Sequence, residues 1–188
     1  MATRKAKTET GGDTGQGTPS PIPPPLTIEQ LRVAVAQDAL RLLRIEWIEP
    51  TKGTYFYSPY SPDLRGLGSK ELQRRLLDSV PECRVCALGL SAISLVRVKD
   101  SISGRDLVWG PDGVARGELG DEWASIVEDA FENWNVADKD GCERLCVLRV
   151  DLEIRERAQL IMQAVIETEG DEDRLRDRLF APTGAANV

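Results

Sequence analysis

The sequence predicts a mainly α-helical fold: a single compact bundle of five to six helices around a buried central helix, with one short β-hairpin. Three observations support this prediction. Apolar residues recur at helical spacing in several segments, most clearly over residues 121–134. Residues 82–98 leave no continuous polar face, which is typical of a helix buried on all sides. β-forming residues stand on both sides of one Pro/Gly turn.

The chain of 188 residues has the size of one domain, which we expect over residues 26–180. Residues 1–25 are rich in Thr, Gly, Ser and Pro, a composition that cannot bury enough apolar surface to offset the entropy of ordering the chain. We therefore expect a disordered tail over residues 1–25 and a disordered C-terminus over residues 181–188. Prolines close the tail and predict a stiff, extended spacer, while a ligand for a groove-type domain is the alternative interpretation. These prolines are Pro21, Pro23, Pro24 and Pro25.

Two helices are expected in the first half of the domain. The first spans residues 28–44 and begins with a capping box of Thr27 and Gln30, whose side chains satisfy free backbone N–H groups. The second is expected to have Ser69 as its capping residue, carries leucines at helical spacing and stops before Pro81.

Between these two helices the pattern changes to β-forming residues. They lie on both sides of Pro50 and Gly53, which are typical turn residues. We therefore predict a short β-hairpin, and its aromatic side chains are Trp47, Tyr55 and Tyr57.

The remaining elements follow the same patterns. The third helix, residues 82–98, is expected at the centre of the bundle, and a glycine-rich connection follows over residues 104–120. The fourth helix, residues 121–134, is amphipathic, and the fifth spans residues 152–168. Residues 142–150 fit either a strand or a helix, and a short charged helix at 171–179 is expected to close the domain.

The composition excludes several classes of function. The chain has 24 Lys and Arg, 31 Asp and Glu and no His, which gives a net charge of −7. The absence of histidine removes the commonest general base and transition-metal ligand, and with them most familiar hydrolase machinery. The acidic balance argues against direct binding of nucleic acid. We see no apolar run of membrane-spanning length and no secretory signal, so we expect a cytoplasmic protein without membrane contact.

Charge is distributed unevenly along the sequence. Residues 118–140 contain eight acids and one base, and the acids of the fourth helix gather opposite its apolar side. Such a face can attract a partner with a basic surface. A solvated helix surface, balanced by an adjacent basic helix, is the alternative. The candidate binding residues on this face are Asp121, Glu122, Glu128, Asp129 and Glu132.

The four cysteines allow two further hypotheses. Cys83 and Cys86 form one pair and Cys142 and Cys146 another, and four thiolates can hold zinc in tetrahedral geometry. A redox role for Cys83 is the second hypothesis, because a helix N-terminus and the neighbouring Arg84 would lower the pKa of its thiol. The simpler interpretation, with no cofactor, is that Cys86 and Cys146 are small buried hydrophobic residues.

Three short segments carry a resemblance to other proteins. They are Cys83-x-x-Cys86-Ala87-Leu88-Gly89, Ile126-x-Glu128-x-Ala130-Phe131-Glu132-x-Trp134 and Gly53-Thr54-Tyr55. With these segments the chain resembles, over about residues 27–170, a loose group of short, uncharacterised proteins of bacteria and phages. The resemblance implies a shared fold and a bacterial or phage setting, and it carries no catalytic residue.

These observations together predict a non-enzymatic protein-interaction or accessory protein of a bacterium or phage. It would bind another protein through the acidic face of the fourth helix, through the aromatic hairpin, or through both. The alternative function is a zinc-binding or thiol-redox protein built on the four cysteines.

Overall fold

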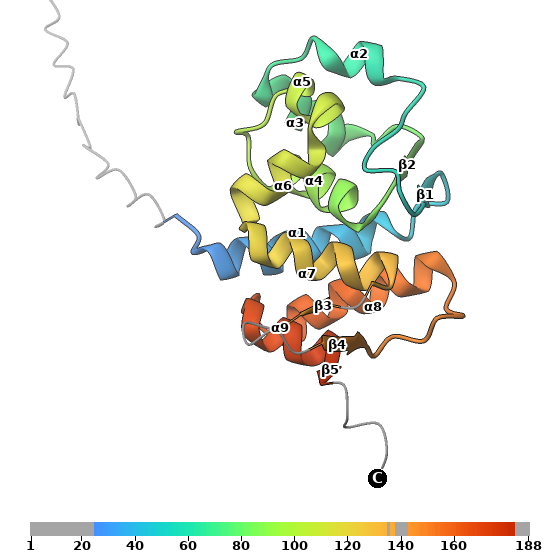
Figure 1. Cartoon of the computed structure of the whole chain (residues 1–188). Coiled ribbons are helices and arrows are strands. Elements are labelled where there is room, and N and C mark those ends of the chain that lie inside the picture. The colour runs from blue at the N-terminus through green and yellow to red at the C-terminus, as the bar shows by residue number, and fades with distance from the viewer. Residues whose placement is uncertain (1–24, 135, 138–142, 183–188) are drawn as a thin grey trace, which may run out of the picture.

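The computed structural model describes residues 25–134, 136–137 and 143–182, and these contain nine helices and five short strands (Figure 1). The helices are α1 (Ile28–Leu42), α2 (Ser61–Arg65), α3 (Ser69–Asp78), α4 (Ala87–Val98), α5 (Gly104–Trp109), α6 (Pro111–Leu119), α7 (Asp121–Glu132), α8 (Ile154–Glu167) and α9 (Glu172–Leu179). The strands are β1 (Ile48–Pro50), β2 (Cys83–Val85), β3 (Val136–Ala137), β4 (Glu143–Cys146) and β5 (Phe180–Pro182). The mainly helical class is confirmed, but the predicted number of helices is wrong, because α2, α5 and α6 form where we expected connections. Among the described residues, no helix combines the length and the apolar character that crossing a bilayer requires.

Helix α4 is buried along almost its whole length. Every residue from Ala87 to Val96 is buried, as the all-round apolar pattern predicts. The helix packs against α1, α3, α6 and α7, whereas α8 packs chiefly against α1 and α7. It begins later than the predicted helix, with Cys86 as its N-cap, because the residues before Cys86 form β2.

The predicted hairpin over residues 45–57 is wrong. Strand β1 pairs in parallel with β2, with Ile48 opposite Cys83. The chain does turn back after β1, but Tyr57 pairs with Arg84 of β2 in an antiparallel bridge. Strand β2 therefore lies between the two expected arms and takes up the backbone groups that they would have offered each other.

The glycine-rich segment that we expected to be a connection is helical. Helix α5 begins with a capping box of Ser103 and Asp106, and α6 carries Pro111 in its first turn, where the missing N–H is not needed. Gly104 is required for packing, since a Cβ there would lie 1.8 Å from the carbonyl oxygen of Leu64 in α2. Gly104 thus permits the close approach of α5 to α2.

The second half of the domain follows the prediction more closely. Helices α7, α8 and α9 lie within the predicted ranges 121–134, 152–168 and 171–179. Residues 142–150, which fitted either type of element, contain β4, the middle strand of an antiparallel sheet with β3 and β5. Strand β5 extends to Pro182, into the segment expected to be disordered. Most of the predicted tail and C-terminus lies outside the described residues.

Arginines join the helices by donating to backbone carbonyl groups near helix ends. Arg32 on α1 donates its Nε to the Leu119 carbonyl at the end of α6, over 2.8 Å. Arg157 on α8, which is 1% exposed, donates to the Ala130 carbonyl near the end of α7, over 2.9 Å. Arg97 on α4 makes an equivalent contact in the last turn of α3. The last carbonyls of a helix have no partner within it, so these contacts satisfy them and fix how the helices are arranged.

Candidate functional site

Strand β2 brings together aromatic residues from both sides of the turn that follows β1. The Trp47 carbonyl accepts a hydrogen bond from the Cys83 N–H over 3.1 Å, and Tyr57 exchanges two backbone hydrogen bonds of 2.8 Å with Arg84. Trp47 and Tyr57 therefore lie at opposite edges of β2. Their side chains are 54% and 58% exposed, which is a large apolar surface to leave in water.

Two adjoining hollows surround Trp47, and together we call them the aromatic groove. The larger, of about 610 Å³, lies against α2 and α3, and the smaller, of about 440 Å³, lies along β1 and β2. Trp47 and Glu82 line both hollows, whereas Tyr60, which is 51% exposed, lines the larger and Tyr57 the smaller. The other lining residues are Glu46, Glu49, Pro59, Asp63, Leu64, Leu67, Glu71, Arg74, Arg75, Ser79, Val80, Pro81, Cys83 and Arg84.

Hydrogen bonds to the backbone hold the rim of the aromatic groove in place. Trp47 donates its Nε1 hydrogen to the Val80 carbonyl over 3.0 Å. The buried Ser58 donates its hydroxyl to the Glu82 carbonyl over 2.7 Å and accepts from the Tyr60 N–H over 3.2 Å. These hydrogen bonds hold the backbone that carries the aromatic side chains. Little binding free energy would therefore be lost in ordering this backbone when a ligand binds.

The aromatic groove is lined by more acidic than basic side chains. The acids are Glu46, Glu49, Asp63, Glu71 and Glu82, and the bases are Arg74, Arg75 and Arg84. Glu49 pairs with Arg84 at 2.9 Å. Within the part of the chain that the structure describes, Glu46 and Glu82 form no ion pair. The groove would therefore attract a ligand that carries basic groups.

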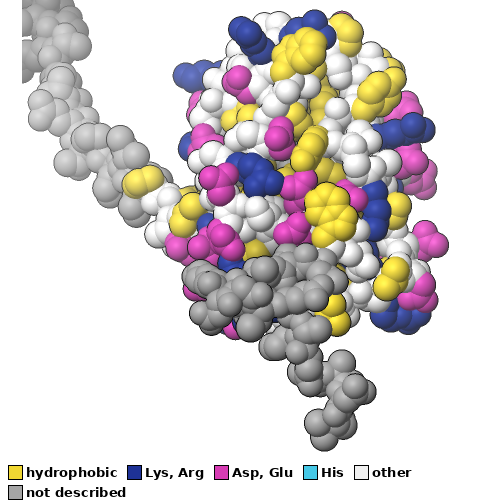
Figure 2. Space-filling model, viewed as in Figure 1, with side chains coloured by type: hydrophobic (Ala, Val, Ile, Leu, Met, Phe, Trp, Pro, Cys, Tyr) yellow, Lys and Arg dark blue, Asp and Glu magenta, His cyan; other side chains and the backbone are white. Residues whose placement is uncertain are grey.

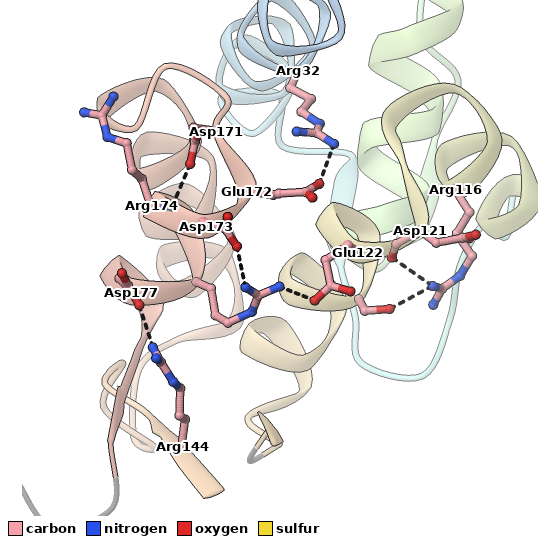
Figure 3. Close-up of polar contacts among 12 residues, drawn as sticks. Arg32, Arg116, Asp121, Glu122, Arg144, Asp171, Glu172, Asp173, Arg174 and Asp177 are labelled. Carbon is pink, nitrogen blue, oxygen red and sulfur yellow. Dashed lines mark hydrogen bonds and ion pairs between the residues drawn. The ribbon is translucent and has the colours of Figure 1, made fainter. Parts of the chain in front are cut away.

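Acidic residues of α7 form ion pairs with arginines of neighbouring helices, although the sequence suggested an open acidic face. Glu122 pairs with Arg176 of α9 (Figure 3). Glu128 pairs with Arg116 of α6 at 2.5 Å, whereas Asp121 is exposed at the start of the helix. On the face of the molecule seen in Figure 2, acidic side chains lie among basic and hydrophobic ones and form no single continuous acidic surface.

The segment between β1 and α2 donates hydrogen bonds to further acceptor groups of α7. The Gly53 N–H donates to Glu132 Oε1, and Lys52 Nζ donates to the Glu132 carbonyl, each over 2.9 Å. Tyr55 Oη donates to Glu128 Oε1 over 2.5 Å. This hydrogen bond, with some burial, raises the pKa of Tyr55 to about 12. Tyr55 therefore contacts α7 and does not line the aromatic groove.

Asp129 differs from the other acids of α7. Its side chain is half-buried, and burial raises the pKa of its carboxyl to about 6. The neighbouring Glu128 acts in the same direction, and Arg116 opposes it. The five acids that we selected from the sequence are thus divided among internal pairs, one exposed residue and one carboxyl whose charge is disfavoured.

The three cysteines that the structure describes lie on different elements of the fold. Cys83 is buried on β2, and Cys86 caps α4, where its Sγ accepts from the Gly89 N–H over 3.5 Å. Burial raises the pKa of Cys83 to about 12 and that of Cys86 to about 11. The predicted lowering of the Cys83 pKa is therefore wrong, because Cys83 lies in a strand and not at a helix start. Cys146 is half-buried on β4, and Cys142 lies outside the described residues, among which no three potential metal ligands gather.

Most residues of the aromatic groove were not singled out from the sequence, and four of them are polar or aromatic residues of particular interest. Tyr60 stands directly before α2, Arg74 and Arg75 lie on α3, and Glu82 precedes β2. Only the fold brings these segments together. The polar face of the predicted second helix was a local signal for the arginines, but it did not indicate what they would face.

The three segments that carry the resemblance meet in space. The Cys86 N–H donates to the Thr54 carbonyl over 2.6 Å, and a Cβ at Gly89 would lie 1.4 Å from the Tyr55 carbonyl oxygen. Gly53, as described above, contacts Glu132 on the third segment. The resemblance itself stays a prediction. Comparison of the chain with protein-family models, with curated proteins and with solved structures finds no match in any of the three.

Proposed function

We propose that this protein is a non-enzymatic interaction protein that binds another protein through the aromatic groove. The observation that carries the proposal is the exposure of Trp47, Tyr57 and Tyr60, each more than half exposed, around two adjoining hollows. Burial of such side chains against a partner, away from water, makes the free energy of binding more favourable.

The composition of the groove supports the same function. Trp, Tyr and Arg are the residues most enriched among those that dominate binding energy at protein interfaces, and all three types line the aromatic groove. The rim is held by hydrogen bonds from Trp47 and Ser58, which lowers the entropy lost on binding. The excess of acids over bases favours a partner with a basic surface.

The acidic face of α7 supports binding less well. Glu122 and Glu128 form ion pairs with arginines of neighbouring helices, and Glu132 accepts from the Gly53 backbone. A partner that recruited these carboxylates would have to break contacts that join helices. We therefore assign the interaction to the aromatic groove and treat the acids of α7 mainly as structural.

Affinity capture with matched variants tests the proposal. The wild type, Trp47→Ala and Tyr57→Ala are compared with Trp134→Ala, which removes an equally exposed tryptophan at the end of α7. We expect a protein that is captured by the wild type and by Trp134→Ala and is lost with both groove variants. Binding of that protein, once purified, should weaken by at least tenfold with Trp47→Ala, because loss of a dominant interface residue weakens binding by about 2 kcal/mol or more. The same set of proteins captured by all four forms would contradict the proposal.

A further inference from the structure

We propose that the partner in the aromatic groove is the proline-rich segment of a second copy of this chain, so that two copies bind each other through exchanged segments. The proposal rests on the proposed function, because it uses the same groove.

The segment that precedes α1 has the chemistry of a ligand for an aromatic groove. Five prolines stand within seven residues, namely Pro19, Pro21, Pro23, Pro24 and Pro25. Proline-rich sequences favour the polyproline II conformation, which has no internal hydrogen bonds and loses little entropy on binding. Grooves lined by aromatic side chains bind such sequences by packing the proline rings against the aromatic faces.

The aromatic groove offers these features at its surface. Trp47 separates the two hollows, with Tyr60 in one and Tyr57 in the other, so aromatic side chains recur along the groove. Glu46 and Glu82, which form no ion pair within the described part of the chain, add negative charge to the groove. The proline run, residues 19–25, carries no charged side chain, so the acidic groove does not repel it.

A chain cannot place its three consecutive prolines, Pro23, Pro24 and Pro25, in its own groove. Helix α1 has 15 residues and is about 22 Å long. It begins on one side of the domain and ends beside β1, where the groove lies (Figure 1). Pro23, the first of the three consecutive prolines, stands five positions before Ile28, a stretch that spans at most about 18 Å when fully extended. A groove that is filled by the complete run, residues 19–25, must therefore belong to another molecule.

A dimer with two-fold symmetry would fill the aromatic grooves of both copies at once. The proline run directly precedes the start of α1, and the other end of α1 lies beside β1, which lines the aromatic groove (Figure 1). When two copies lie side by side with their α1 helices antiparallel, each proline run reaches the groove of the other copy. Such a reciprocal arrangement is closed, so it produces dimers and not open chains.

Two full-length variants that break opposite halves of the contact test this proposal. The groove variant is Trp47→Ala with Tyr60→Ala, and the segment variant is Pro21→Ser with Pro23→Ser and Pro24→Ser. In sedimentation equilibrium, we expect the wild type and the control Trp134→Ala to dimerise. Each broken variant alone should associate at least tenfold more weakly than the wild type. An equimolar mixture of the two broken variants should regain a 1:1 pair, because one supplies an intact segment and the other an intact groove.

The outcomes separate this proposal from the proposed function. A wild type that stays monomeric, or a mixture of the variants that shows no association, would overturn the exchange of proline segments. Circular dichroism confirms that each variant is folded before it is compared. If the exchange is overturned while Trp47→Ala still abolishes capture of another protein, the proposed function remains. If Trp47→Ala changes neither association nor capture, both proposals are wrong.

Discussion

Tyr55 Oη lies 2.5 Å from Glu128 Oε1, so the segment that leaves β1 is joined to α7 by a hydrogen bond to a charged acceptor. Glu128 also pairs with Arg116 of α6. One carboxylate of α7 therefore connects the segment after β1 with the preceding helix α6. The same segment continues to Tyr57, which pairs with β2 and lines the aromatic groove. We therefore expect this contact to stabilise both the domain and one wall of the groove.

Removing the Tyr55 hydroxyl tests the first part of this expectation. Tyr55→Phe should lower the free energy of unfolding by about 1.5–2 kcal/mol, the lower part of the range for hydrogen bonds to charged groups, because the side chain is 37% exposed. Urea unfolding measures the change. Tyr57→Phe is the matched control, since its exposed ring should tolerate the substitution within about 0.5 kcal/mol. Equal effects of the two substitutions would show that the hydrogen bond does not stabilise the domain.

The same contact predicts a change of stability in alkali. The folded pKa of Tyr55 is raised from 10.0 to about 12, so folding favours the protonated hydroxyl. The stabilisation is therefore complete below pH 10 and is lost as the pH rises toward 12. The difference in free energy of unfolding between wild type and Tyr55→Phe should shrink over this interval. A difference that stays constant up to pH 12 would contradict the raised pKa.

Gly89 is required because the backbone of Tyr55 lies directly on α4. A Cβ at Gly89 would lie 1.4 Å from the Tyr55 carbonyl oxygen, and neither backbone can move without disturbing β2 or the core. Gly89→Ala should therefore destabilise the protein by more than about 3 kcal/mol or prevent folding. Gly113→Ala in α6 is the matched control, because a Cβ there meets nothing within 4 Å and alanine favours helix by up to about 1 kcal/mol. We expect Gly89→Ala to lower the melting temperature and Gly113→Ala to raise it, and thermal unfolding of both variants measures these changes.

Asp129 predicts a dependence of stability on pH near neutrality. Burial raises the pKa of its carboxyl from 3.8 to about 6, with Glu128 and Glu122 acting in the same direction and Arg116 opposing them. The contribution of Asp129 to stability is therefore complete below pH 3.8 and is lost as the pH rises through about 6. Asp129→Asn should be more stable than the wild type at pH 7.5, and this advantage should fall at pH 4.5. An equal advantage at both pH values would show that Asp129 has an ordinary pKa.

Local signals predicted those parts of the fold that depend on neighbours in the chain. The capping box of Thr27 and Gln30 is formed, whereas the predicted cap of α3 is wrong by one residue, because Gly68 is the N-cap and Ser69 is the first residue of the helix. The capping box of Ser103 and Asp106 was an equally local signal for α5. It was missed because the glycines that follow were interpreted only as turn residues.

Contacts between distant segments could not be predicted in the same way. Residues 48–50 and 83–85 are each extended, but nothing in either segment specifies that they pair in parallel. Trp47 and Tyr57 were selected as binding residues and do line one groove, whereas Tyr55 turns to α7 because Glu128 offers it an acceptor. The internal pairing of the α7 acids likewise depends on arginines of α6 and α9. The chemistry of single residues was therefore predictable, while their grouping was set by packing.

The buried thiols provide a test of the redox alternative. A variant that keeps only Cys83 and Cys86, made by Cys142→Ser and Cys146→Ser, should react very slowly with a maleimide at pH 8. Folded pKa values of about 12 and 11 leave a thiolate fraction of about 10⁻³ or less, against roughly 10⁻¹ for an unperturbed thiol, so the native rate should be at least about 100-fold below the unfolded rate.

The control for this measurement is the same variant in denaturant, where both thiols should react at the ordinary rate. Metal analysis of the wild-type protein accompanies it and addresses the zinc alternative, which needs all four cysteines. Fast reaction of Cys83 in the native state would restore the redox hypothesis. Zinc at one equivalent that is lost with Cys83→Ser would instead show that the thiols converge on an ion, and the interaction function would then have to be argued together with that metal site.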